Sequence, residues 1–272
     1  MDGFSGDSCP TKALEMSSMS RSGLDRDVDE CRFRDRWYDV LLELEDDLRE
    51  QPEALARRLA MPLCERPGLV VRSIRRAVEA SVALTVLVIT APLMLYMVIA
   101  IRRDTPGPAF FRQTRLTVGG RPFELLKFRG MYVDARERFP ELYDYELGQA
   151  EAAEYLFHVK DDPRVTPIGR RFRRSSLDEL PNFWNVLRGE IGLVGPRPQI
   201  PEMFPYYGSY RDIVLSVKPG IFALPKVYFR DDLTLRDTYL IDAYYVHSRS
   251  LRLDAKVICR GIGTVLARRH VY

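Results

Sequence analysis

The chain has 272 residues and a hydrophobic fraction of 46%, which is enough for one substantial domain with short appendages. Its formal net charge of +3 is too small to identify a partner, although the basic residues are mostly Arg and are clustered, which suits anionic partners. The four cysteines show neither a CxxC pair nor metal-ligand spacing, so we expect free thiols in a reducing compartment.

The N-terminal part contains no early hydrophobic run of the kind that a signal peptide requires. Residues 1 to about 30 are rich in Ser, Gly and Asp, so we expect them to be disordered. Apolar residues at helical spacing over 33–48, and again at Leu55 and Leu59, predict two amphipathic helices. A solvated helical extension over 1–70 is the favoured interpretation; a docking element, a self-association helix of a homo-oligomer and a membrane-surface helix are the alternatives.

An apolar, uncharged stretch of about 22 residues runs from Ala80 to Ile101. A helix of this length covers a bilayer core of about 30 Å, so the stretch predicts a membrane segment. Pro92 lies near its middle and removes a backbone hydrogen bond. Both flanks are basic, with Arg72, Arg75 and Arg76 before the stretch and Arg102 and Arg103 after it. Balanced flanks favour a re-entrant helix-break-helix over 71–103, with a kinked crossing helix as the alternative.

The chain after the membrane segment, residues 104–272, predicts one small mixed α/β domain. A Pro/Gly turn leads towards a strand at 123–128, and Lys127 and Arg129 project basic groups on the same side. Two solvated charges on an edge strand would give the same pattern. The charged segment 134–159 predicts a helical insertion, to which we assign no catalytic role.

The strongest local signal is Ser-Ser-Leu-Asp-Glu-Leu-Pro at 175–181. Ser176 and Glu179 have capping-box spacing, so we expect a helix that begins near Ser176 and carries Asp178 and Glu179 at its positive end. Apolar residues then recur at helical intervals: Leu180, Phe183, Trp184, Leu187 and Ile191. Pro181 would remove a hydrogen bond from such a helix. The alternative is that Pro181 occupies the first turn of a helix that begins later.

Basic residues surround this pair of carboxylates. Arg173 and Arg174 stand just upstream and can add charge-assisted hydrogen bonds to phosphate oxygens, and Pro196-Arg197-Pro198 forms a rigid basic corner downstream. A Ser followed by Asp-Glu is also how an ordinary well-capped helix begins. The wider pattern of motifs decides between these interpretations.

Several motifs stand in order along the chain. Ser176 to Pro198 contains SLDELP, NVL and LVGPRP in succession. Four shorter motifs accompany it: PGPAFFRQ at 106–113, KFR at 127–129, DPRVT at 162–166 and KPGI at 218–221. From near Val71 almost to the C-terminus, these motifs resemble the bacterial initiating sugar transferases, the monotopic polyprenyl-phosphate phosphoglycosyl transferases.

The resemblance implies a membrane-anchored α/β enzyme with amphipathic interfacial helices and a cytoplasmic catalytic domain at the inner membrane. It implies transfer of a sugar-1-phosphate from a UDP-sugar to polyprenyl phosphate, with release of UMP and no nucleic-acid partner, at the start of polysaccharide or glycoprotein glycan synthesis. Asp178 is the implied nucleophile, through an aspartyl phosphosugar, and Glu179 the implied Mg²⁺ ligand. The implied substrate-binding residues are Lys127, Arg129, Arg173, Pro196, Arg197 and Arg230, with Asp242 and Asp254 as supporting carboxylates.

The sequence departs from the family pattern in several places. Ala91 precedes Pro92 where the family has Ser, so Thr90 is the candidate to satisfy the freed backbone group. The RxGxxG motif at 115–120 lacks its first Gly, and KPGIFA at 218–223 replaces KPGITG. The substrate contacts of that second loop therefore stay open.

Two other classes of function stay open as well. A membrane-tethered scaffold could hold anionic lipid or nucleic acid with the same basic residues, without catalysis, although two carboxylates among them would weaken a pure anion binder. A transferase of the same kind could use a different donor or acceptor. Near the C-terminus, His247 is expected to be a partly exposed interfacial side chain and not a metal ligand, and the basic, apolar tail 256–272 is expected to lie on an anionic membrane surface.

Overall fold

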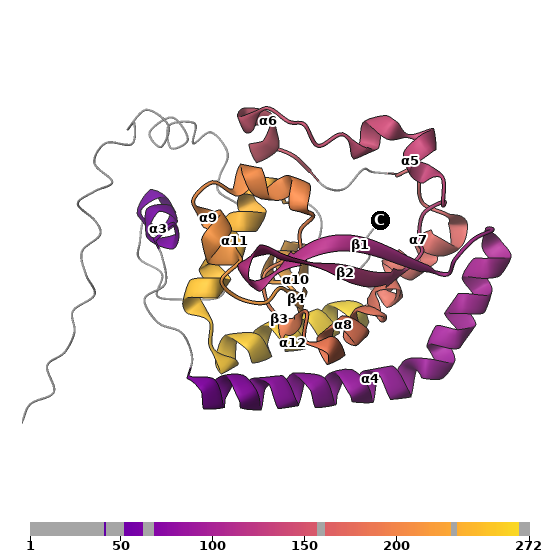
Figure 1. Cartoon of the computed structure of the whole chain (residues 1–272), viewed down its shortest axis with the longest axis horizontal. Helices are drawn as coiled ribbons and strands as arrows, with labels where there is room; N and C mark the ends of the chain where they lie inside the picture. The colour runs from indigo at the N-terminus through magenta and orange to yellow at the C-terminus, as the bar shows by residue number, and fades with distance from the viewer. Residues whose placement is uncertain (1–40, 42–51, 62–67, 157–160, 230–232, 267–272) are drawn as a thin grey trace, which may run out of the picture.

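The computed structural model describes residues 41, 52–61, 68–156, 161–229 and 233–266 (Figure 1). The segments expected to be disordered over 1–30 and helical over 33–48 therefore lie outside the described residues, apart from Leu41. In the described part, helices surround two small sheets of two strands each. The expected mixed α/β architecture is confirmed, with far more helix than strand.

The first sheet is an antiparallel hairpin of β1 (Phe110–Thr117) and β2 (Arg121–Phe128), joined by the 3-10 turn η3 (Val118–Gly120). It confirms the strand expected at 123–128. Gly119 and Gly120 have φ angles of 71° and 74°, which residues with a Cβ rarely adopt, so the tight turn depends on glycine. Thr117, which replaces the motif's first Gly, ends β1 and donates its hydroxyl to the Glu190 carbonyl over 2.5 Å.

The second sheet pairs β3 (Gly192–Val194) with β4 (Gly220–Phe222) in parallel. The two backbones touch beside this pair, because a Cβ added to Gly220 would lie 2.1 Å from the nitrogen of Gly195. Helix α8 (Asn182–Arg188) precedes β3, and helix α10 (Leu224–Phe229) follows β4. The sheet thus brings the two motif regions around 176–198 and 218–229 together.

The core of the domain is built on α11 (Leu235–Ser248), in which residues 240–246 are all buried. The expected helical insertion at 134–159 is only partly helical where it is described, since short helices there alternate with loops. The remaining elements after α4 are α5 (Ala135–Arg138), η4 (Pro140–Tyr143), α6 (Gln149–Ala153), α7 (Pro167–Arg174), η5 (Leu177–Glu179), η6 (Pro201–Tyr207), α9 (Tyr210–Val214) and α12 (Leu251–Leu266).

The apolar stretch forms one helix, α4 (Leu69–Asp104), which stays helical through Pro92 and bends in its second half (Figure 1). The expected break is therefore a bend within a continuous helix. Pro92 has no N–H to offer the carbonyl of Val88, four residues earlier. The sequence makes Thr90 the candidate to satisfy that carbonyl. In the structure its hydroxyl donates instead to the Val86 carbonyl over 2.7 Å.

The first limb of α4 is attached to the domain by two arginines. Arg76 donates to the carbonyls of Val186 and Leu187 in the last turn of α8, over 2.7 Å and 2.5 Å. Arg75 donates to the Val194 carbonyl and forms an ion pair of 3.1 Å with Asp254. These two arginines, expected as a basic flank of the membrane segment, bind protein groups instead.

The second limb of α4 packs on the same domain. Met97 and Ile101 are buried in one cluster with Phe128 of β2 and Phe172 of α7. Both limbs of α4 therefore contact the same domain.

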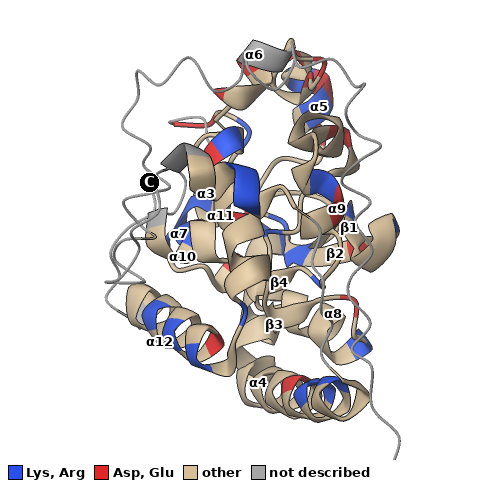
Figure 2. Cartoon of the chain, turned by 90° about the vertical axis from the view of Figure 1, so that its left-hand side faces the viewer, with Lys and Arg blue, Asp and Glu red and all other residues tan. Residues whose placement is uncertain are grey.

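The opposite face of α4 is apolar and exposed over most of its length. Its exposed residues include Val70, Val71, Ile74, Val78, Val82, Val88, Ile89, Leu95, Tyr96 and Ile99. By length and composition α4 could cross a membrane, and it is the one such helix among the described residues. Figure 2 shows α12, with a row of basic residues, on the same side of the molecule as α4. An exposed apolar surface of this extent is typical of a membrane or partner contact.

Helix α3 (Pro52–Leu59) is not the solvated helix that we favoured from its sequence. Leu55 and Leu59 are fully buried in the main core. The Tyr210 hydroxyl donates to the Ala56 carbonyl over 2.9 Å, and the half-buried His247 ring contacts the Leu59 carbonyl at 3.1 Å. Helix α3 therefore packs on the core of its own chain.

Replacing Gly169 with Ala should destabilise the domain. Its Cβ would lie 2.1 Å from the Gly130 carbonyl oxygen, so α7 would have to move away from the segment after β2. We expect a loss of about 1–3 kcal/mol in the free energy of unfolding, measured by urea titration of the detergent-solubilised protein. Gly263→Ala is the matched control, because a Cβ there meets open space. Equal stability of the two variants would contradict this packing.

Candidate active site

The Asp-Glu pair lies in a one-turn 3-10 helix and not in the first turn of a longer helix. Ser176 has a φ angle of 55°, which ends α7, and its side chain caps nothing. The α-helix begins only at Asn182, directly after Pro181. The expected capping box is therefore wrong, and the alternative of a later helix start is confirmed. The turn η5 presents Asp178 and Glu179 side by side.

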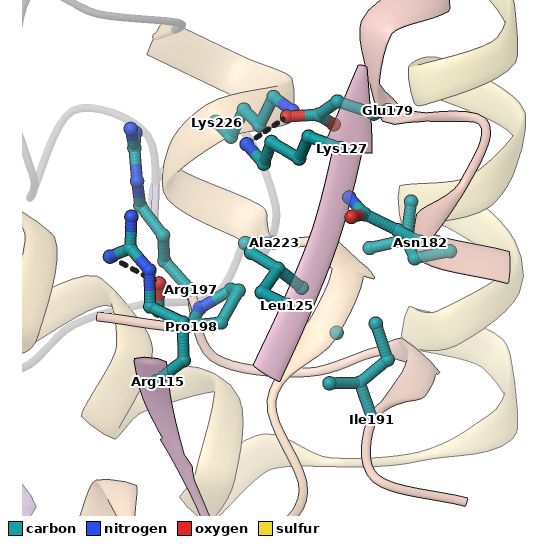
Figure 3. Close-up of a pocket in the computed structure, with 12 residues that line it drawn as sticks. Arg115, Leu125, Lys127, Glu179, Asn182, Ile191, Arg197, Pro198, Ala223 and Lys226 are labelled. Carbon is teal, nitrogen blue, oxygen red and sulfur yellow. Dashed lines mark hydrogen bonds and ion pairs between the residues drawn. The ribbon is translucent and has the colours of Figure 1, made fainter. Parts of the chain in front are cut away.

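Glu179 is held by two lysines that come from distant parts of the chain. Lys127 of β2 donates to its Oε1 over 2.9 Å, and Lys226 of α10 forms a short ion pair with its Oε2. Figure 3 shows the carboxylate between the two ammonium groups. Burial alone would raise the pKa of Glu179, but the two lysines hold it far below its ordinary value. The carboxylate is therefore ionised throughout the physiological pH range.

The pKa of Asp178 is shifted in the opposite direction. Burial raises its pKa above the ordinary value, and the adjacent Glu179 charge raises it further, against the opposing charges of Lys127, Lys226 and Arg173. Two neighbouring carboxylates whose pKa values are pushed in opposite directions are characteristic of sites with two distinct chemical roles.

Two arginines lie across a small pocket from Glu179 (Figure 3). Arg115 of β1 donates to the Pro198 carbonyl over 3.0 Å and to Gln113 over 2.6 Å. Burial, together with the charge of Arg197, lowers the pKa of Arg115 to about 10, so the Arg115 guanidinium stays charged at neutral pH. The pocket, of about 50 Å³, therefore joins a basic wall to Glu179, whereas the neighbouring Asp178 does not line it.

The basic corner at 196–198 is fixed from behind. The fully buried Asp242 carboxylate accepts from the backbone N–H of Arg197, at 3.1 Å and 3.2 Å from its two oxygens. The Pro196 carbonyl accepts from the Gly220 N–H over 2.9 Å. Asp242 and Pro196 thus hold the main chain that carries Arg197 towards the pocket.

The structure places three other expected residues away from this pocket or beside it. Arg129 is buried and donates to the carbonyls of Pro106 and Thr105, over 2.6 Å and 2.7 Å, so it secures the turn after α4 and does not line the pocket. Asp254 pairs with Arg75 and accepts from Tyr245 over 2.7 Å, so it anchors α4. Arg173 lies against Gly130, close enough to Asp178 to affect its pKa. Arg230 lies outside the described residues.

Sequence reasoning missed two charged residues of the pocket. Lys226 lies 47 positions from Glu179, and no local pattern distinguishes it. Arg115 was recognised only as part of a turn motif, although the alternation of β1 places it on the same face as Gln113, with which it bonds. The polar side chain of Asn182 also lines the pocket, with its Oδ1 buried and without a hydrogen-bond partner.

The resemblance to the sugar transferases implies a bound Mg²⁺ ion, and few side chains of the described residues are suitable ligands for it. The described residues contain no group of three or more His, Cys, Asp or Glu side chains that could enclose a metal. Mg²⁺ often binds through one or two carboxylates together with substrate phosphates and water. Glu179 and Asp178 fit that pattern once a phosphate is present, although lysines engage both oxygens of Glu179.

Known proteins match this chain over the same residues. A family model described as "Bacterial sugar transferase" matches residues 70–268. A Caulobacter vibrioides protein named "UDP-glucose:undecaprenyl-phosphate glucose-1-phosphate transferase" is 32% identical over 253 residues, which cover 89% of this chain and 88% of that protein. The "UDP-galactose-lipid carrier transferase" of Erwinia amylovora is 36% identical over 202 residues, or 74% of this chain and 42% of that protein.

A third relative is the "Undecaprenyl-phosphate galactose phosphotransferase" of Salmonella typhimurium, 33% identical over 220 residues, which cover 81% of this chain and 45% of that protein. The chain thus spans less than half the length of the Erwinia and Salmonella relatives. The family match includes α4 and the whole described pocket, and it leaves out α3. The chain belongs to the bacterial sugar transferase family.

Proposed function

We propose that this protein transfers a sugar-1-phosphate from a UDP-sugar to the phosphate of a polyprenyl lipid and releases UMP. The observation that carries the proposal is the Asp178-Glu179 turn, in which Glu179 is paired with Lys127 over 2.9 Å and with Lys226 beside a pocket that Arg115 and Arg197 line. The name of the Caulobacter relative, which describes glucose-1-phosphate transfer to undecaprenyl phosphate, supports the same reaction. The step would begin a polysaccharide or a glycoprotein glycan.

In the proposed mechanism, Asp178 attacks the β-phosphorus of the donor. An Oδ–P bond forms, the bond from that phosphorus to the bridging oxygen breaks, and UMP leaves with the electron pair. A phosphate oxygen of the lipid then attacks the aspartyl phosphosugar, and the Asp178 carboxylate is released. Covalent catalysis of this kind divides one difficult displacement into two easier ones.

Both steps bring anions together, so the site has to supply positive charge. Lys127 and Lys226 balance the two carboxylates, and Arg115, Arg173 and Arg197 add further positive charge around them. In our proposal Arg197 also contacts the uridine nucleotide, because a planar guanidinium can stack on a base or bind phosphate through two hydrogen bonds. A Mg²⁺ ion bound through Glu179 would neutralise part of the diphosphate charge.

We further propose that α4 is re-entrant, so that the catalytic domain and both ends of the helix lie on the cytoplasmic face of the inner membrane. Support comes from the contacts of both limbs with one domain: Arg75 and Arg76 before the bend, Met97 and Ile101 after it. A crossing helix would carry these groups to opposite sides of the bilayer. The exposed apolar face of α4 would then enter one leaflet, and α12 would lie at the interface.

The topology can be tested by cysteine labelling. In a cysteine-free variant, we expect single cysteines introduced as Met61→Cys and Val133→Cys, two exposed positions on either side of α4, to resist an impermeant maleimide in intact cells. Both should react after permeabilisation. Labelling of one of the two positions in intact cells would show a crossing helix.

The Glu179→Gln variant tests the charge at the second carboxylate. The substitution keeps the shape but removes the negative charge that pairs with the lysines and would bind Mg²⁺, so we expect turnover to fall by about 10²–10³-fold. UMP release from a panel of UDP-sugars, with polyprenyl phosphate as acceptor, measures it. The exposed Glu137→Gln serves as the control for loss of a carboxylate elsewhere. Near-normal turnover with unchanged Mg²⁺ dependence would mean that the metal is held by other groups.

The covalent step can be tested without an acceptor. Enzyme mixed with UDP-sugar alone should release UMP in an amount no greater than the enzyme itself, and steady-state kinetics should be ping-pong. Intact-protein mass spectrometry should show an added phosphosugar that maps to the peptide containing Asp178. Asp178→Asn should form no adduct yet still bind donor, because the basic residues remain.

Asp212→Asn, an exposed position on α9, is the control and should form the adduct normally. Loss of activity in Asp178→Asn cannot by itself distinguish a nucleophile from a general base. Intersecting kinetics with no adduct after rapid quenching would instead indicate direct transfer in a ternary complex.

A further inference from the structure

The lysine pair at Glu179 has a consequence for metal binding. Lys127 and Lys226 each bind a different oxygen of the carboxylate, and only 17% of the Glu179 side chain is exposed. A divalent cation on the same carboxylate would lie within a few ångströms of two ammonium groups. At that separation the repulsion is strong in a partly buried site, so at least one ammonium has to leave.

Lys226 is better placed to leave than Lys127. Lys127 lies in β2, whose backbone is paired with β1 along its length and is further held by a 3.0 Å hydrogen bond from the Leu126 N–H to Asn185. Lys226 lies on α10, a helix of six residues.

The pocket also offers Lys226 a second position. Lys226 and Glu179 line the same cavity as Arg115 and Arg197, the residues that would receive the anionic donor. A diphosphate in that cavity would bring negative charge to the ammonium of Lys226. The lysine could therefore exchange the carboxylate for phosphate and stay paired with an anion throughout.

We propose that Lys226 is a displaceable cation, which in the donor-free enzyme occupies the place on Glu179 that a divalent metal takes when the nucleoside diphosphate donor enters. This inference rests on the proposed function, in which Glu179 is the metal ligand. Metal and donor then bind cooperatively, since each removes an obstacle to the other. By linkage, the factor by which donor tightens metal binding equals the factor by which metal tightens donor binding.

The test is binding of Mn²⁺, followed by electron paramagnetic resonance, to the full-length detergent-solubilised protein with and without UDP. In the unsubstituted protein we expect UDP to tighten Mn²⁺ binding by about tenfold. Lys226→Met should bind Mn²⁺ about tenfold more tightly than the unsubstituted protein when UDP is absent, and UDP should add little further. Mn²⁺ binding in Lys226→Met that is no tighter than in the unsubstituted protein would overturn the inference.

Three further variants make the result specific. Lys226→Arg keeps the charge and should bind Mn²⁺ as the unsubstituted protein does. Lys256→Met removes an exposed lysine from α12 and should change nothing; tightening equal to that of Lys226→Met would indicate a general charge effect and overturn the inference. Lys226→Gln, compared with Lys226→Met in thermal unfolding and Mn²⁺ binding, guards against misfolding of one variant.

Glu179→Gln separates this inference from the proposed function. Loss of Mn²⁺ binding in Glu179→Gln, without any tightening in Lys226→Met, would overturn the role of Lys226 alone. Unchanged Mn²⁺ binding in Glu179→Gln would overturn the assignment of the metal to Glu179 and, with it, this inference.

Discussion

The ion pairs of Glu179 with Lys127 and Lys226 are the interaction on which the arrangement of the site depends. Two adjacent carboxylates in a partly buried turn would repel each other and would also repel an anionic substrate. The lysines remove both difficulties, and each arrives by a different route. The β1–β2 hairpin carries Lys127, and the parallel pairing of β3 with β4 brings α10 and Lys226 back to the turn that follows α7.

The attachment of α4 couples this site to the apolar surface of the molecule. Arg76 binds the last carbonyls of α8, the helix that begins three residues after Glu179, and Arg75 binds the carbonyl that ends β3. At the other end of α4, the buried Arg129 ties the turn at 105–106 to the end of β2, two residues after Lys127. The apolar helix is therefore a structural part of the framework around the candidate active site.

Close contacts between glycine backbones also fix the position of the site. Gly169 against Gly130 brings α7 next to the segment after β2, and Gly195 against Gly220 brings the arginine corner next to β4. A larger side chain at Gly169, Gly195 or Gly220 would not fit without movement of main-chain atoms. Contacts between main-chain atoms thus fix the positions of the carboxylate turn and of the segment that carries Arg197. The lysine and arginine side chains can still change partners when a ligand binds.

The sequence by itself determined the features that depend on residues close together in the chain. The Asp178-Glu179 pair as the candidate site, the length of the apolar helix and the strand that contains Lys127 could all be predicted, because each leaves a periodicity or an ordered motif within a few residues. The 3-10 turn that carries the pair could not, because the same residues also fit the start of a capped helix. Only the tertiary structure decided that Lys226 and Arg115 belong to the pocket, that Arg129 is buried at the turn after α4, and that Arg75 and Arg76 bind the domain. It also decided that α3 docks through Leu55 and Leu59. These facts depend on contacts between residues far apart in the chain, where a long basic or apolar side chain has many available partners and only the packing of the elements selects one.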